Sequence, residues 1–143
     1  MKKNNKGFSL VELIIVIAIM AILAGALAPA LIKYIAKSRR STDVSNAQTI
    51  ATAVTNALSV EAAYDAATGN QVITLDKDSA AGGLAGSTDK FLGEIGSQLG
   101  SSKFKPKYDK DKEFTITLSS DKSTFTVTVD SSELYPDVCA AYK

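Results

Sequence analysis

Glu12 is the residue whose position in this chain most requires a chemical partner. It stands at the head of an uncharged apolar run, residues 13–32, whose twenty residues include no Asp, Glu, Lys or Arg. A helix of that length spans about 30 Å, which is the thickness of the hydrocarbon core of a bilayer. An unpaired carboxylate in such surroundings costs several kcal/mol. The sequence therefore predicts that a positive charge pairs with Glu12, or that Glu12 has a function of its own.

The sequence offers few residues suited to catalysis, metal binding or nucleic-acid binding. The chain has no histidine, and it has no phosphate-binding glycine loop and no Ser or Cys in a nucleophile motif. We therefore predict that it is not an enzyme, with no cofactor and no small-molecule substrate. Asp76-x-Asp78 and Asp109-x-Asp111 offer oxygen ligands of the kind calcium takes, but neither completes an EF-hand, and we predict no metal site. Without lysines 2, 3 and 6, the 16 basic residues fall to 13 against 15 acidic ones, so we predict no direct nucleic-acid partner.

The residues around the head of the apolar run resemble a known family. The resemblance is carried by Lys6-Gly7-Phe8-Ser9-Leu10-Val11-Glu12 and by the run that follows, with Pro29 inside it. These features are similar to those of type IV prepilins and pseudopilins, over residues 6 to about 45. The resemblance implies that a membrane peptidase cuts between Gly7 and Phe8 and methylates the new Phe8 amine. It also implies that the apolar segment stays on the mature protein.

The spacing of Phe8 and Glu12 fits that processing. A cut after Gly7 would leave an ammonium on Phe8, four residues and one helical turn before Glu12. Where apolar helices bundle, a buried amine and a buried carboxylate are tolerable only as a pair. The pair can form within one chain or between a new subunit and its neighbour. The resemblance implies the second, with Glu12 selecting the register of assembly; the alternative is that Ser9 and Glu12 are only a capping box.

Cleavage by ordinary signal peptidase is a further alternative. Lysines 2, 3 and 6 would be the basic region, residues 10–23 the apolar region, and Ala24-Gly25-Ala26 the cleavage site. The product would be a secreted binding domain released near Ala26. Against this, Glu12 interrupts the apolar region, and the run continues well past Ala26 to residue 32.

Two features of the run and its border have predicted roles. Pro29, with Gly25 before it, should kink or loosen the helix, because proline lacks a backbone donor and clashes with the preceding turn. By resemblance, this segment unwinds in part within a filament; a static kink is the alternative. Four basic residues lie at the membrane edge, namely Lys33, Lys37, Arg39 and Arg40. Of these, Arg39 and Arg40 should contact lipid headgroups or acidic residues of a neighbouring subunit.

The helical pattern continues beyond the run as an amphipathic stripe. The stripe has spacings of three and four residues and consists of Ala47, Ile50, Ala51, Val54, Ala57, Leu58 and Glu61. We expect one helix from about Phe8 to about Tyr64, ended by Thr68-Gly69-Asn70. Such a length exceeds the roughly 25 residues of globular helices and itself indicates a membrane or filament helix.

The remainder predicts a small sheet. Residues 113–119 and 124–130 alternate apolar side chains with Thr or Ser around an Asp121-Lys122-Ser123 turn, which is an antiparallel hairpin with one apolar face. Residues 71–75 predict another strand. Between them, residues 76–102 hold six of the nine glycines and are either a short helix from near Thr88 or a glycine-rich loop with an apolar anchor.

The predicted fold class is therefore α+β, a long N-terminal helix packed on a small antiparallel sheet, as in pilins. We expect a leader at residues 1–7, a membrane or filament-core helix at 8–32, its amphipathic continuation at 33–64 and a globular head at 65–143. The single cysteine, Cys139, cannot form the C-terminal disulfide of many Gram-negative pilins, which favours a Gram-positive or an anaerobic source.

The predicted function is that of a structural subunit of a type IV pilus, with a pseudopilin as the alternative. The subunit would reside in the cytoplasmic membrane before it enters an extracellular filament of its own copies. The resemblance implies a prepilin peptidase, an inner-membrane platform protein and an assembly ATPase as partners. Adhesion, motility, biofilm formation and DNA uptake are outputs of such filaments.

Overall fold

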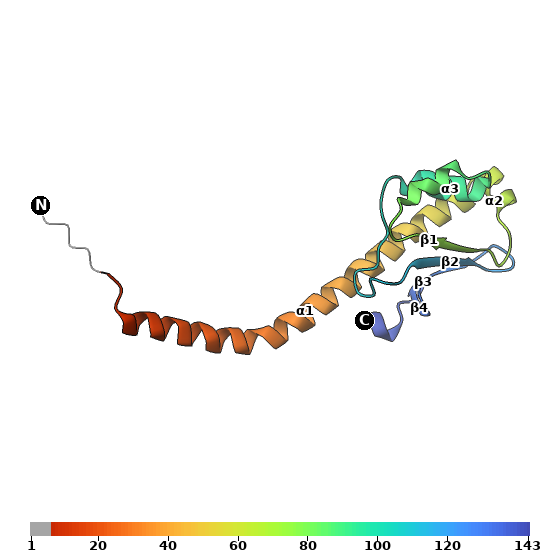
Figure 1. Ribbon diagram of the computed structural model, residues 1–143. Helices are drawn as coiled ribbons and strands as arrows, with labels where there is room; N and C mark the ends of the chain where they lie inside the picture. The colour runs from red at the N-terminus through yellow and green to blue at the C-terminus, as the bar shows by residue number, and fades with distance from the viewer. Residues whose placement is uncertain (1–6) are drawn as a thin grey trace, which may run out of the picture. The chain divides into compact units, whose positions relative to one another are not determined.

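The computed structural model describes residues 7–143, so the expected leader lies outside the described residues except for Gly7. The chain divides into two compact units, Met1–Ala36 and Lys37–Lys143. Helix α1 (Leu10–Leu58) has 49 residues, beginning in the first unit and ending in the second (Figure 1). We describe each unit by itself.

The first unit consists of the apolar part of α1. Its most apolar 18-residue window has a mean hydropathy of 2.8, and no residue of that window is buried. Within residues 7–143, α1 is the one helix whose length and composition suit a membrane crossing. The helix continues through Gly25 and Pro29, and a methyl group on Gly25 would meet nothing within 4 Å. The apolar side chains therefore need lipid or other helices to cover them.

The second unit contains a four-stranded antiparallel sheet in the order β1-β2-β3-β4. The strands are β1 (Val72–Leu75), β2 (Phe114–Leu118), β3 (Phe125–Val129) and β4 (Ser132–Tyr135). The predicted hairpin is confirmed, with Ile116 opposite Val127. β4 was not predicted. Its register against β3 shifts between Val127 and Thr128, and only Leu134 of its four residues is fully buried, so it lacks a clean apolar alternation.

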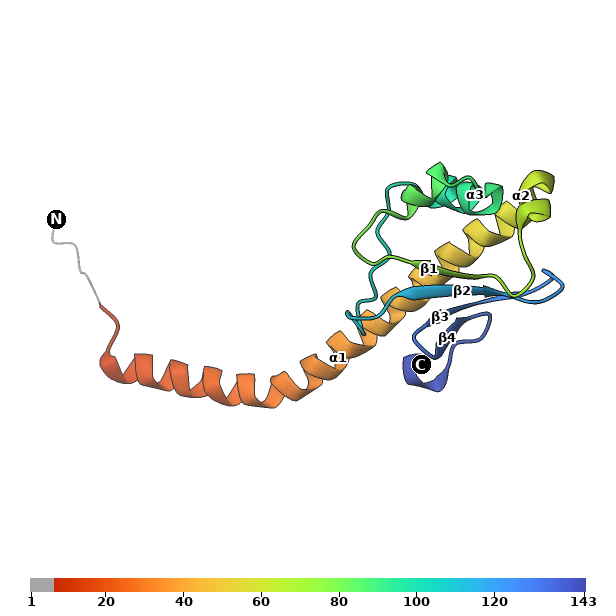
Figure 2. The same cartoon turned by 45° about the vertical axis from the view of Figure 1, so that its right-hand side comes forward.

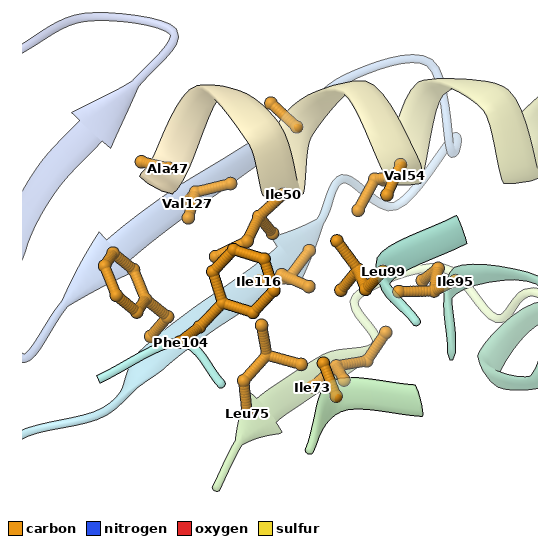
Figure 3. Packing of buried hydrophobic residues seen from close by; sticks show 14 of the residues in the cluster. Ala47, Ile50, Val54, Ile73, Leu75, Ile95, Leu99, Phe104, Ile116 and Val127 are labelled. Atoms are coloured by element: carbon orange, nitrogen blue, oxygen red, sulfur yellow. The ribbon is translucent and has the colours of Figure 1, made fainter. Parts of the chain in front are cut away.

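One face of the sheet and the last turns of α1 form the core. Figure 3 shows Ile50 of α1 above Ile116 of β2, with Val127 of β3 beside it and Leu75 of β1 below. Burying each such side chain contributes about 1.5–3 kcal/mol. The opposite face of the sheet carries threonines from β1, β2 and β3. The predicted packing of helix on sheet is confirmed, and the fold is an α+β, pilin-like fold.

Helix α1 ends earlier than predicted. It stops at Leu58, and a separate short helix, α2 (Glu61–Ala66), follows. Val60 adopts an extended conformation with φ −91° and ψ 116°, and its N–H donates to the Ala57 carbonyl in a tightened last turn. Glu61 is consequently exposed on the new helix and is not part of the buried stripe. The sequence has no proline or glycine between Leu58 and Glu61 that would have predicted the end of the helix there.

The glycine-rich region is partly helical. Helix α3 (Lys90–Leu99) is capped by Asp89, whose carboxylate accepts hydrogen bonds from the N–H groups of Phe91 at 2.9 Å and Leu92 at 3.5 Å. A 3-10 helix, η1 (Ala81–Gly86), precedes it and packs on it. The short helix is therefore confirmed over the open loop. Its apolar side, including Phe91 and Leu99, closes the core.

Gly96 permits the contact between α3 and η1, and we expect Gly96→Ala to destabilise the head. A Cβ at this position would overlap backbone atoms of Leu84 and Ala85, so one of the two helices must shift. The expected loss is about 1–3 kcal/mol of unfolding free energy, the usual cost of overpacking. Denaturant unfolding followed by circular dichroism measures it.

Gly93→Ala is the matched control for that substitution. A Cβ on Gly93 would lie 3.7 Å from the Ala85 oxygen, an ordinary contact, in the same helix. Alanine also favours helix over glycine by about 1 kcal/mol. Gly93→Ala should therefore stabilise the head slightly. Equal losses from both variants would show that the close approach at Gly96 is not the cause.

Candidate functional site

The N-terminal candidate residues lie at the start of α1 and before it. Gly7, Phe8 and Ser9 precede the helix, and the Phe8 side chain is 88% exposed. A methyl group on Gly7 would meet nothing within 4 Å. The bond between Gly7 and Phe8 is thus in non-helical, open backbone, which is the form that a peptidase can bind.

Glu12 is held at the first turn of α1. Its Oε2 accepts a hydrogen bond from the Ser9 N–H at 2.8 Å, while the Leu13 N–H donates to the Ser9 carbonyl at 3.1 Å. This is the Glu half of a capping box, and the carboxylate lies at the positive end of the helix dipole. In the uncut chain the capping interaction is therefore present. The hydrogen bond also holds the carboxylate at Ser9, the residue directly after Phe8. A cut after Gly7 would create an amine on Phe8.

The basic residues after the apolar run are in different environments. Lys33, Lys37 and Arg39 are exposed. Arg40 is half-buried instead: its guanidinium lies 4.4 Å from the centre of the Tyr108 ring, and its Nη2 donates to the Tyr108 hydroxyl at 2.7 Å. A cation over an aromatic ring contributes about 0.5–2 kcal/mol. Arg40 therefore joins α1 to the loop before β2, a contact that the sequence analysis did not predict.

Asp43 is a structural residue that the sequence analysis missed. It is fully buried, and its two carboxylate oxygens accept the backbone N–H groups of Lys107 at 2.6 Å and Tyr108 at 2.8 Å. Burial raises the pKa of the Asp43 carboxyl, although these two hydrogen bonds oppose that effect. The available signal was its spacing, because Asp43 lies four residues before Ala47, in line with the apolar stripe.

The C-terminal turn packs on the same cluster. The rings of Tyr108 and Tyr142 meet edge to face with centroids 5.6 Å apart. Burial, reinforced by the charge of Asp43, raises the pKa of Tyr142 to about 12. Cys139 has a free thiol and is half-buried, and its N–H donates to the Glu133 carbonyl at 2.9 Å.

Of the two acidic pairs considered for calcium, Asp76 and Asp78 make contacts within the chain. Asp76 accepts hydrogen bonds from the Asp78 N–H and the Ser79 hydroxyl, which lowers the pKa of its carboxyl, and Asp78 pairs with Lys105 at 3.4 Å. Asp121 accepts from two serine hydroxyls in the β2–β3 turn, which lowers the pKa of its carboxyl to about 2. In residues 7–143 there is no group of three or more His, Cys, Asp or Glu that could hold a metal ion.

Comparison with known proteins gives a match for the N-terminal part of the chain. The family model for the prokaryotic N-terminal methylation motif matches residues 2–28. This stretch includes Gly7, Phe8, Glu12 and Gly25, and it covers most of the apolar run but none of the second unit. No curated protein matches the chain, and no solved structure matches it either. These comparisons give no support to a Gram-positive source.

Proposed function

We propose that this chain, which is a type IV prepilin-like protein, is a structural subunit of a type IV pilus. The observation that carries the proposal is the methylation motif over residues 2–28 on a helix whose apolar side chains are uncovered. The motif and the apolar helix suggest membrane anchoring followed by assembly, and the head is a folded domain with its own core.

The proposed processing places each N-terminal residue in a role. A prepilin peptidase cuts between Gly7 and Phe8 and methylates the Phe8 amine. The open backbone at Gly7 and the exposure of Phe8 support access to this bond. The new ammonium then pairs with Glu12 of a neighbouring subunit, and this pairing selects the register of assembly.

Assembly proceeds through the apolar part of α1. Like helices replace lipid around residues 13–32, so little apolar surface is exposed to water during the transfer. A repeated head-to-tail contact that does not close gives a filament. Gly25 and Pro29 provide a weak point at which α1 unwinds when it packs in the filament. An inner-membrane platform protein and an assembly ATPase drive the process. Residues 1–7 act as the leader, 8–32 as the filament-core helix, 33–64 as its amphipathic continuation, whose α1 part packs on the head, and 65–143 as the rest of the head.

The N-terminal mass of the mature protein tests this proposal. Material sheared from the cell surface should contain a chain that begins at Phe8 and is about 14 Da heavier than the unmodified chain, owing to an N-methyl group. A chain that begins at Leu27 would instead show signal-peptidase cleavage after Ala26 and an exported domain. That result would overturn the filament proposal.

A pseudopilin is the second candidate, because the methylation motif is shared by both classes. A pseudopilin would give the same mature N-terminus but would form only a short secretion- or competence-linked structure. Electron microscopy of the sheared fraction separates them. Long filaments labelled by an antibody to the head support the pilus, and the absence of such filaments with correct processing supports the pseudopilin.

A further inference from the structure

The end of the second unit that α1 enters carries a basic surface built from two distant parts of the chain. We call it the basic collar, and it consists of Lys37, Arg39, Arg40, Lys107 and Lys110. All of these except Arg40 are exposed. The first three are on α1, and the last two are in the loop between α3 and β2, which reaches α1 in Figure 2.

Hydrogen bonds to the buried Asp43 carboxylate fix the loop at Lys107 and Tyr108 beside α1. The Lys107 and Tyr108 N–H groups both donate to Asp43, and the Tyr108 ring lies under the Arg40 guanidinium. Along α1, Lys37 and Asp43 are separated by about 9 Å of helix rise. The backbone at Lys107 is thus held along the first two turns of α1 in this unit.

The charge of the collar is largely uncompensated. The ion pairs found in residues 7–143 are Lys105 with Asp78 and Lys112 with Asp130, and neither involves a collar residue. Asp43 is buried and its two oxygens are occupied by backbone N–H groups. The remaining loop carboxylates are Asp109, Asp111 and Glu113, so the five basic residues of the collar outnumber the three acidic residues of the loop.

Chain connectivity keeps the collar near the end of the apolar run, whatever the orientation of the two units. Lys37 is five positions after Ile32, so the two Cα atoms are at most about 18 Å apart even if the chain between them is extended. A lysine side chain adds several ångströms of reach, and electrostatic attraction to a charged membrane extends about 8–10 Å at physiological ionic strength. The Lys37 end of the collar therefore remains within reach of the headgroup layer when residues 13–32 are in a bilayer, and the loop held at Asp43 lies about 9 Å of helix rise beyond it.

We propose that the basic collar binds anionic lipid headgroups and holds the head against the membrane surface before assembly. The partner is the phosphate layer of an anionic membrane, because the collar is tied to the apolar run itself. The basic residues on α1 alone follow the axis of one helix. The loop held at Asp43 adds two lysines and so makes the basic surface wider. Each basic residue near an anionic membrane strengthens binding by about five-fold.

Hydrogen exchange of the full chain in lipid nanodiscs tests this proposal. One set of discs contains phosphatidylcholine alone, and the other contains phosphatidylcholine with a third of phosphatidylglycerol. The amides of residues 109–112 should exchange at least about ten-fold more slowly in the anionic discs, and the difference should disappear in high salt. Equal exchange in both discs at low salt would overturn the proposal.

Two variants and an internal reference sharpen the result. Lys107→Gln/Lys110→Gln should abolish the lipid-dependent protection. Lys90→Gln should retain this protection, because Lys90 is away from the collar. Lys90 follows Asp89, which accepts a hydrogen bond from Gln71 just before β1. That end of β1 pairs with Thr117, whereas the collar loop joins β2 at Phe114, opposite the other end of β1. The proposal rests on insertion of the apolar run, and slow exchange at residues 14–23 in both discs verifies insertion separately. If protection of the loop instead increases with the number of protein copies per disc, also in phosphatidylcholine alone, the collar binds a second subunit. That result would overturn lipid binding.

Discussion

Glu12→Ala is expected to leave membrane insertion and cleavage largely intact while filament assembly falls at least about a hundred-fold. The variant removes the proposed partner of the Phe8 amine, and an uncompensated buried charge costs about 3–5 kcal/mol. Cleavage is read from the shift in mass of membrane-bound protein, and assembly from the amount of subunit in the sheared fraction. The two readouts separate a processing defect from an assembly defect.

Glu12→Gln distinguishes the charge pair from the capping interaction. The observed hydrogen bond to the Ser9 N–H needs only an acceptor oxygen, which glutamine supplies, and glutamine serves well in a capping box. If Glu12 acts by its charge, the Gln variant assembles as poorly as the Ala variant. If Glu12 only caps the helix, the Gln variant assembles normally and the proposed register role is wrong. Glu61→Ala, at an exposed position on α2, is the control.

Asp43→Ala is expected to lower the unfolding free energy of the head by about 3 kcal/mol. The substitution leaves the N–H groups of Lys107 and Tyr108 without acceptors in a buried site, and each such loss costs about 1–3 kcal/mol. For a domain of this size the midpoint of thermal unfolding should fall by roughly 10–20 °C. Circular dichroism of the full chain in detergent micelles measures the midpoint.

Asp43→Asn should be destabilised less than Asp43→Ala, because its amide oxygen still accepts one of the two hydrogen bonds. Exposed Asp111→Asn, in the same loop, should leave the midpoint nearly unchanged. An Asp43→Ala midpoint within a few degrees of the wild type would mean that the loop is held by the apolar contacts of Phe104 and Pro106 alone.

The same site gives a pH dependence of defined sign. The pKa of Asp43 is raised in the folded state above its ordinary 3.8. Between pH 3.8 and the folded-state pKa, the folded protein therefore binds more protons than the unfolded protein. Stability from this group therefore falls as pH rises through the folded-state pKa, and it increases as pH falls from neutral toward 3.8. The disadvantage of Asp43→Asn relative to wild type should grow over that acidification. Asp121 acts oppositely: its pKa is lowered to about 2, so its contribution is present above 3.8 and is lost below it. A constant gap between wild type and Asp43→Asn from neutral pH to pH 3.8 would contradict the assignment to Asp43.

The sequence alone determined the features that depend on local order and periodicity. The apolar run, the carboxylate at Glu12 and the residues before it predicted a prepilin-like N-terminus, and residues 2–28 match the methylation motif. Alternation at period two predicted the β2–β3 hairpin, and period 3.6 predicted the buried stripe of α1. These signals are readable because each residue's role is set by neighbours a few positions away.

Only the tertiary structure decided the features that join distant segments. In the sequence, Asp43 is a charged residue in line with an apolar stripe and has no evident partner. The structure provides the partners, which are the N–H groups of Lys107 and Tyr108, 64 and 65 residues later in the chain. Arg40 appears as one more basic residue until Tyr108 lies beneath it. The end of α1 at Leu58 and the added strand β4 likewise depend on how the chain packs back on its core. The cost of burying a charge is offset only by specific partners, and the sequence does not show which distant backbone will provide them.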